Sequence, residues 1–261
     1  MNTTNSPVFE HVEVAGQRLE YYWSRPRVKG EPVLVFLHEG LGSAGLWRNI
    51  PAQLGARTGL PALVYSRYGY GGSAVLVGQR TVEYMHHEAL EVLPALRNAL
   101  SLDDVILVGH SDGGSISLIH AGAGQWPVRG LMLMAPHVFV EDITIAGIED
   151  ARVAYETTDL PARIGRRHTD GEATFRGWND IWLDPDFRDW NIEVSLPGIT
   201  APVLVLQGEE DEYGSALQLE AIAAQAGGPV DTLLIPDCRH SPQRDQPEAV
   251  LTAMAEFVVR V

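Results

Sequence analysis

The chain lacks most features of disulfide-bonded, membrane-spanning or secreted proteins. Its 261 residues include one cysteine, Cys238, so no disulfide can form within the chain and a reducing compartment is expected. No apolar run approaches the ~20 residues that a membrane-spanning helix needs. Residues 1–6 are polar and show no apolar core of a signal peptide. We therefore expect a cytoplasmic protein that does not enter membranes.

Positive charge is scarce as well. The 19 Lys and Arg residues face 34 Asp and Glu residues, which gives a formal net charge of −15. This excess of negative charge argues against nucleic acid and anionic membrane surfaces as partners, and weakly against anionic substrates. The sequence has no Cys-x-x-Cys, His-Glu-x-x-His or phosphate-loop pattern. We expect neither a metal nor an organic cofactor.

The residues that are present suit a globular enzyme of one large domain. Hydrophobic residues make up 45% and charged residues 20%, which is ordinary for such a chain. Short apolar runs alternate with helical patterns, which predicts an α/β fold with a mostly parallel sheet and helices on both faces. The expected strands cover residues 8–14, 17–23, 33–37, 62–65, 105–108, 130–134, 203–207 and 232–235, and two expected helices cover 81–100 and 247–259.

The most informative segment is Gly-His-Ser-Asp-Gly at residues 109–113. It directly follows an apolar run and precedes a helical pattern of small residues. A strand, a sharp turn bearing serine and a helix form the nucleophile elbow of serine hydrolases, in which glycines relieve the strained turn. The helix N-terminus beneath the serine favours negative charge. This context predicts that Ser111 is a nucleophile.

A serine nucleophile needs a base and a group that orients the base. Asp211 follows the predicted strand at 203–207, and His240 follows the one at 232–235. The chain order Ser111, Asp211, His240 is that of the α/β-hydrolases. Glu141 and Asp142, after the strand at 130–134, are alternatives for the acid.

These motifs allow a resemblance to be named. Segments 37–43 (Leu-His-Glu-Gly-Leu-Gly-Ser) and 67–73 (Arg-Tyr-Gly-Tyr-Gly-Gly-Ser), the elbow, and segments 208–211 and 240–248 span most of the chain. Together they resemble the α/β-hydrolase superfamily, in particular its lidded esterases, lactonases and C–C hydrolases. The resemblance implies an α/β-hydrolase fold and a serine hydrolase activity, but says little of the substrate.

The resemblance also implies an oxyanion hole. Its backbone donors would be the N–H groups of Asp112 and Gly40, with Glu39 as the alternative to Gly40. Glu39 stands where relatives often carry glycine, and a carboxylate there opposes developing negative charge unless it is paired or turned away. Arg67 is one possible partner for either acid, Glu39 or Asp112. Otherwise, both acids are expected to face solvent or bind nearby backbone N–H groups.

Residues 136–198 contain no buried-strand pattern. We interpret them as a helical cap inserted after the sixth strand, with residues 1–135 and 199–261 forming the core domain. We expect Trp178 and Trp182 of the cap to line the substrate pocket, because pockets are mostly apolar and aromatic, and place His110 beside them. The basic residues Arg163, Arg166 and Arg167 are interpreted as a solvated surface, with a clamp for a substrate carboxylate as the alternative.

The predicted activity is hydrolysis of small or medium, mainly neutral and apolar carboxylic esters or lactones. The main alternative is a C–C bond hydrolase or enol-lactonase of aromatic degradation, which would use the same triad. Amino-acid ester hydrolysis, a cofactor-free perhydrolase activity and a ligand-binding role with little turnover remain further alternatives. A proline iminopeptidase is disfavoured, because Glu39 replaces a glycine expected in that group's loop.

Overall fold

The computed structural model describes residues 7–261. The expectation that residues 1–6 are not part of a signal peptide therefore concerns residues outside the described part. Its centre is one sheet of eight strands in the order β1-β2-β4-β3-β5-β6-β7-β8. Strands β1 and β2 run antiparallel to their neighbours, and the other pairs are parallel. The strands are β1 (Glu10–Val14), β2 (Gln17–Trp23), β3 (Val33–Leu37), β4 (Ala62–Tyr65), β5 (Val105–His110), β6 (Gly130–Met134), β7 (Val203–Gly208) and β8 (Val230–Ile235).

The inner parallel strands are buried on both faces, which explains their continuous apolar runs. In β3 the residues Val33, Val35 and Leu37 pack in one hydrophobic cluster, and Leu34 and Phe36 pack in a second. The side-chain alternation of a strand therefore divides the core into two layers, one on each face of the sheet.

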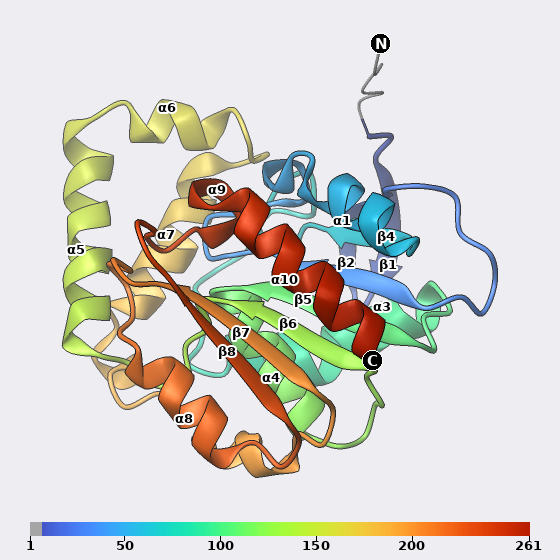
Figure 1. Ribbon diagram of the computed structural model, residues 1–261. Helices are drawn as coiled ribbons and strands as arrows, with labels where there is room; N and C mark the ends of the chain where they lie inside the picture. Colours follow the sequence, from blue (N-terminus) through green and yellow to red (C-terminus); the bar gives the residue numbers. More distant parts are fainter. Residues whose placement is uncertain (1–6) are drawn as a thin grey trace.

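Helices cover both faces, as the sequence predicted. Helices α1 and α10 pack together on one face, in front of the sheet in Figure 1, and α3, α4 and α8 pack on the other. The helices of these two layers are α1 (Ile50–Thr58), α2 (Tyr84–His87), α3 (Leu93–Ala99), α4 (Asp112–Gly122), α8 (Leu217–Gln225) and α10 (Pro247–Arg260). Short helices η1 (Ala44–Trp47) and α9 (Pro242–Asp245) lie in the loops after β3 and β8.

The helix predicted at 81–100 has three parts. A π-helical segment, η2 (Glu88–Val92), joins α2 to α3. Pro94 lies at the start of α3 and has no N–H to donate to the preceding turn. A π-bulge beside a proline accommodates the missing hydrogen bond and the bulk of the ring, which a simple periodicity argument does not capture.

The segment between β6 and β7 is helical, and contributes one isolated bridge, Phe139 to Asn191, rather than a sheet strand. Its helices are α5 (Asp142–Thr157), α6 (Leu160–Gly165), α7 (Gly171–Trp182), η3 (Pro185–Phe187) and η4 (Glu193–Gly198). Figure 1 shows α5, α6 and α7 as an arch at one side of the sheet. Thr174 Oγ1 donates to the carbonyl of Gly69 at 2.7 Å, which ties α7 to the loop after β4.

No helix within residues 7–261 is both long and apolar enough to cross a membrane.

Candidate active site

Ser111 occupies the sharp turn between β5 and α4. Its φ of 52° and ψ of −119° form a strained combination for a residue with a side chain. The flanking glycines are required by close packing: a Cβ on Gly109 would lie 2.5 Å from the carbonyl oxygen of Gly113, and a Cβ on Gly113 would lie 2.1 Å from that of Leu37. The local geometry is thus that of a nucleophile elbow.

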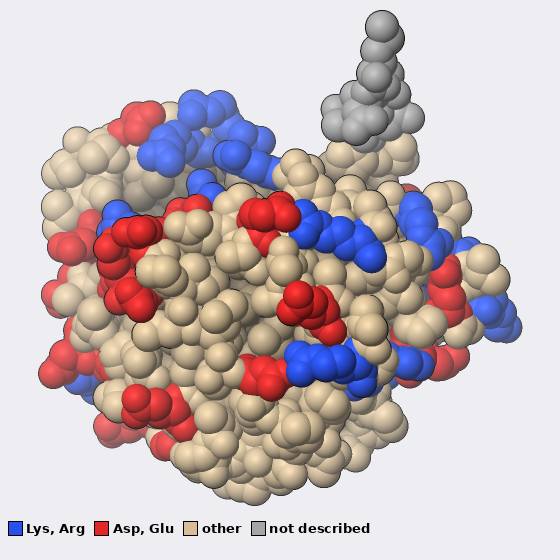
Figure 2. Space-filling model, viewed as in Figure 1, with Lys and Arg blue, Asp and Glu red and all other residues tan. Residues whose placement is uncertain are grey.

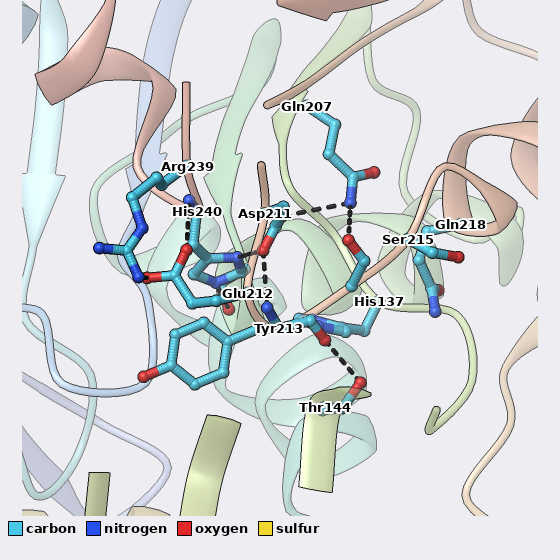
Figure 3. Close-up of polar contacts among 12 residues, drawn as sticks. His137, Thr144, Gln207, Asp211, Glu212, Tyr213, Ser215, Gln218, Arg239 and His240 are labelled. Carbon is cyan, nitrogen blue, oxygen red and sulfur yellow. Dashed lines mark hydrogen bonds and ion pairs between the residues drawn. The ribbon is translucent and has the colours of Figure 1, made fainter. Parts of the chain in front are cut away.

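His240 lies between Ser111 and Asp211. Its Nδ1 is 2.8 Å from Oδ1 of Asp211, and its Nε2 is 3.0 Å from Oγ of Ser111. Asp211 and His240 follow the neighbouring parallel strands β7 and β8, which bring them to the same edge of the sheet. Asp211 also accepts hydrogen bonds from the Tyr213 backbone N–H at 2.9 Å and the Gln207 amide at 3.1 Å (Figure 3). These contacts fix the carboxylate on the side of the ring away from Ser111.

The charges of this group reinforce one another. Burial lowers the pKa of His240, but the charge and hydrogen bond of Asp211 outweigh it, so the pKa is raised above its ordinary value. Burial likewise opposes ionisation of Asp211, yet His240 and the Tyr213 N–H lower the pKa of this carboxyl. With Nδ1–H donating to Asp211, a neutral His240 turns the lone pair of Nε2 toward the Ser111 hydroxyl. That tautomer is the one a general base requires.

The two alternative acids lie elsewhere. Glu141 caps α5, and its carboxylate accepts from the Ser215 hydroxyl at 2.6 Å and the Gln218 amide at 2.7 Å. Asp142 is exposed and forms an ion pair with Arg188. Glu141 and Asp142 thus hold the start of α5 in place. Of the three acids, only Asp211 contacts His240.

The predicted oxyanion donors lie on both sides of Ser111. Asp112 is the first residue of α4, so its N–H is one of the amide groups that an α-helix leaves without an internal partner. Gly40 lies in the loop after β3 and lines the same cavity as Ser111. A Cβ on Gly40 would lie 2.0 Å from Nε1 of Trp178, so only glycine fits beneath this indole.

The side chain of Asp112 does not face this cavity. It is fully buried, and its Oδ2 accepts from Arg67 Nη2 at 3.2 Å and from the Tyr84 hydroxyl at 2.9 Å. The expectation that Asp112 faces solvent or binds local backbone is therefore wrong. Pairing of the Glu39 carboxylate with Arg67 is also wrong, because Arg67 contacts only the backbone carbonyl of Glu39, at 3.1 Å. Burial explains both corrections, since an isolated buried carboxylate needs a compensating charge and Arg67 supplies it.

The Glu39 carboxylate pairs instead with His110, whose Nδ1 is 3.3 Å from Oε2 of Glu39. Burial alone would raise the pKa of Glu39, but the hydrogen bond and charge of His110 and the nearby His38 lower it to about 2. Glu39 is therefore ionised and partly open to the cavity, which both residues line. The Nε2 of His110 also donates to the carbonyl of His240 at 2.7 Å, so His110 supports the histidine loop.

The site opens into a cavity of about 440 Å³. Trp178 and Trp182 line it, as predicted, together with Ser111, His240 and Gly40. Trp190 packs instead against Phe187, with the two rings stacked 5.3 Å apart. The apolar part of the lining also includes Leu41, Leu46, Ile148, Leu160 and Ile164.

Sequence reasoning missed two parts of the lining. His137 lies with its ring centroid 5.6 Å from that of His240, and its Nε2 donates to the carbonyl of Tyr213 at 3.0 Å. The cavity is also lined by five arginines: Arg48, Arg163, Arg166, Arg167 and Arg244. Those on α6 and the following turn are exposed, as expected, but they border the cavity instead of a plain solvated surface. The sequence shows Arg163, Arg166 and Arg167 as a local cluster, but no local pattern links them to Arg48 and Arg244.

Within residues 7–261, no group of three or more His, Cys, Asp or Glu side chains has an arrangement that could hold a metal ion.

Residues 34–253 match the model of the alpha/beta hydrolase family. The chain belongs to this family. It is a hydrolase by that membership, and its eight-stranded, mostly parallel sheet agrees with the predicted fold class.

Similar proteins differ in their activities. A proline iminopeptidase of Saccharolobus solfataricus is 26% identical over 239 residues, which cover 74% of this chain and 75% of that protein. The crystal structure of VinJ superposes with a TM-score of 0.72 at 25% identity, covering 98% of this chain and 99% of VinJ. The enol-lactonase of Burkholderia xenovorans LB400 has a TM-score of 0.74 at 18% identity, covering 96% and 100%, a likeness of fold alone. The family thus establishes hydrolysis, and the substrate must be inferred from the site.

Proposed function

We propose that this protein hydrolyses small or medium carboxylic esters or lactones through an acyl-enzyme formed on Ser111. The observation that carries the proposal is the position of His240, hydrogen-bonded to Asp211 through Nδ1 and to Ser111 through Nε2. A base held in this tautomer and within reach of a serine hydroxyl is the arrangement that serine hydrolases of unrelated folds share.

In the proposed reaction, Oγ of Ser111 attacks the ester carbonyl carbon while Nε2 of His240 takes the hydroxyl proton. Asp211 keeps the ring oriented and stabilises its cation. The N–H groups of Asp112 and Gly40, or of Glu39 in place of Gly40, would donate to the oxyanion. Collapse of the tetrahedral intermediate breaks the C–O bond, and His240 gives its proton to the leaving alcohol. A water activated by His240 then releases the acid and restores Ser111.

The cavity lining supports an apolar substrate part near the serine. Trp178 and Trp182 are contributed by α7 and lie in the same cavity as Ser111. Rigid aromatic walls of this kind hold an acyl or alcohol group at low entropic cost. We infer that the helical segment 136–198 acts as a cap that sets substrate size.

The direct test is a panel of p-nitrophenyl esters and lactones of increasing chain length, assayed with the wild-type protein and with Ser111→Ala. We expect turnover by the wild type and a loss on the order of 10⁴-fold or more in the variant. Ring-cleavage products of aromatic degradation belong in the same panel. Faster turnover of those products than of any ester would replace esterase by C–C hydrolase or enol-lactonase, with the same triad.

A second candidate function is hydrolysis of aminoacyl esters or amides. The ionised Glu39 carboxylate on the cavity wall supports it, because it could accept a hydrogen bond from a substrate ammonium group. The similarity to a proline iminopeptidase points the same way. A comparison of alanine p-nitrophenyl ester with the propionyl ester, on wild type and Glu39→Gln, tests it. A preference for the amino ester that disappears in Glu39→Gln supports this function, and equal rates on wild type exclude it.

A further inference from the structure

Five exposed arginines line the cavity, and we call them the arginine rim. They come from three separate segments of the chain: Arg48 follows η1, Arg163, Arg166 and Arg167 lie on α6 and the turn after it, and Arg244 lies on α9. All five are exposed, whereas Ser111 and Trp182 in the same cavity are buried. Figure 2 shows Lys and Arg side chains gathered over α6 and the segment that follows it. The rim is therefore the outer end of the site.

The guanidinium groups of the rim are not used in the fold. Among residues 7–261, the guanidinium groups of these five form neither an ion pair nor a hydrogen bond, a lack that only Arg18 and Arg176 share. Arg25, Arg57, Arg129 and Arg188 pair with acids, and Arg27, Arg80 and Arg97 donate to backbone carbonyls. This difference is informative in a chain where 34 acids outnumber 19 Lys and Arg residues. Because acidic residues are so abundant in this chain, five arginines that pair with none of them have their positive charge available to a ligand.

The acids of the cavity do not neutralise the rim. Two carboxylates line the cavity, those of Glu39 and Glu212. Glu39 is paired with His110, and Glu212 is paired with Arg239 at 3.3 Å and accepts from the His240 backbone N–H at 3.1 Å. Five like charges around one opening repel one another, and a bound anion removes that repulsion. The charged side chains that line this cavity, five arginines against two glutamates, thus have a balance opposite in sign to the net charge of the molecule.

We propose that the arginine rim is a subsite for an oxyanion, a phosphate or carboxylate group, at the outer end of the substrate. A guanidinium group presents two parallel N–H donors to such oxygens, which makes arginine suited to both. The anion would anchor the solvent end while the apolar part lies against the tryptophans and the scissile carbonyl reaches Ser111. This inference rests on the proposed function, and it replaces the expectation of a neutral substrate drawn from net charge.

Two matched substrate pairs distinguish the sources of the anion. Butyryl-coenzyme A and butyryl-N-acetylcysteamine share a thioester, but only the first carries phosphates. The p-nitrophenyl hemiester of glutarate and p-nitrophenyl butyrate share an aryl ester, but only the first carries a carboxylate. We expect the anionic member of one pair to have a kcat/KM at least about tenfold higher at low salt, and the advantage to shrink as salt rises, because exposed charges are screened within about 10 Å at 0.1 M.

The variants are Arg163→Gln/Arg166→Gln/Arg167→Gln and, as a matched control, Arg176→Gln, an exposed arginine of α7 outside this cavity. The triple variant should lose the anionic preference and keep turnover of p-nitrophenyl acetate, and Arg176→Gln should keep both. No preference in either pair, or a preference that the triple variant retains, overturns the proposal.

A binding measurement separates this proposal from the proposed chemistry. Pyrophosphate is titrated calorimetrically into Ser111→Ala and into Ser111→Ala carrying the triple substitution. If Ser111→Ala binds pyrophosphate and the triple substitution weakens this binding at least tenfold, the anion subsite is supported even if no ester is turned over. In that case only the proposed function fails. If Ser111→Ala does not bind pyrophosphate and neither substrate pair shows a preference for its anionic member, the proposed anion subsite is wrong. The ester assay then still tests the proposed catalytic role of Ser111, Asp211 and His240.

Discussion

Arg67, in the loop after β4, and Asp112, the first residue of α4, form a fully buried ion pair, with Nη2 of Arg67 at 3.2 Å from Oδ2 of Asp112. The same nitrogen lies 3.3 Å from the carbonyl oxygen of His38 and 3.1 Å from that of Glu39. His38 fixes the loop further, because its Nδ1 donates to the Glu39 carbonyl and its Nε2 accepts from the Arg67 N–H. One guanidinium group therefore holds the glutamate loop and the elbow together.

The ion pair predicts a large effect on stability. Arg67→Leu leaves Asp112 buried without its cation, which should lower the free energy of unfolding by roughly 3–5 kcal/mol. Asp112→Asn removes the unpaired buried charge, so the double variant Arg67→Leu/Asp112→Asn should recover a large part of the lost free energy of unfolding. Urea unfolding of the three variants measures this. A loss below about 1 kcal/mol for Arg67→Leu would show that the pair contributes little to the fold.

The acid of the triad is tested by paired substitutions. Asp211→Asn should reduce kcat on the order of 10⁴-fold, because the ring loses the acceptor that fixes its tautomer. Asp142→Asn is the matched control, since Asp142 is exposed and pairs only with Arg188, and its kcat should stay within about twofold. The reverse ranking would assign the acid to the loop after β6.

The raised pKa of His240 predicts the acid limb of the activity profile. The base must be neutral to accept the Ser111 proton, so kcat/KM should fall as the pH drops through the folded-state pKa, which lies above 6.5. Asp211→Asn removes the main contribution that raises this pKa, so the limb of its residual activity should move to lower pH. A limb below pH 6 in the wild type, or a shift to higher pH in the variant, contradicts the assignment.

The contact between Gly40 and Trp178 predicts a suppressible defect. Gly40→Ala places a methyl group 2.0 Å from the indole nitrogen, so either the loop or the tryptophan must shift, and kcat should fall by roughly 10²-fold through a displaced oxyanion donor. Adding Trp178→Ala makes room and should restore part of kcat toward that of Trp178→Ala alone. Kinetics of the two single variants and the double variant form the cycle. Additive losses would mean that Gly40 matters for another reason.

The sequence was most informative where function depends on local geometry. The elbow glycines at 109 and 113 and the positions of Asp211 and His240 after successive strands follow from short patterns and chain order. The sequence offered Arg67 as a partner for Glu39 or Asp112 but could not decide between them, because Arg67 and Asp112 are 45 residues apart and only packing brings them together. Similarly, Arg163, Arg166 and Arg167 were visible as a basic cluster, but only the fold shows that they line one cavity with Arg48 and Arg244.

Activation of Ser111 by His240 can be measured directly by labelling with a fluorophosphonate probe, followed by peptide mass spectrometry. The probe phosphonylates a serine only when a neighbouring base activates it. We expect stoichiometric modification at Ser111, faster at pH 8 than at pH 5. The modification should be abolished in Ser111→Ala and strongly slowed in His240→Gln. Ser115, on the next helical turn, is the internal control and should stay unmodified. Labelling at another residue, or labelling of Ser111 at an unchanged rate in His240→Gln, would contradict the assignment of Ser111 as a nucleophile activated by His240.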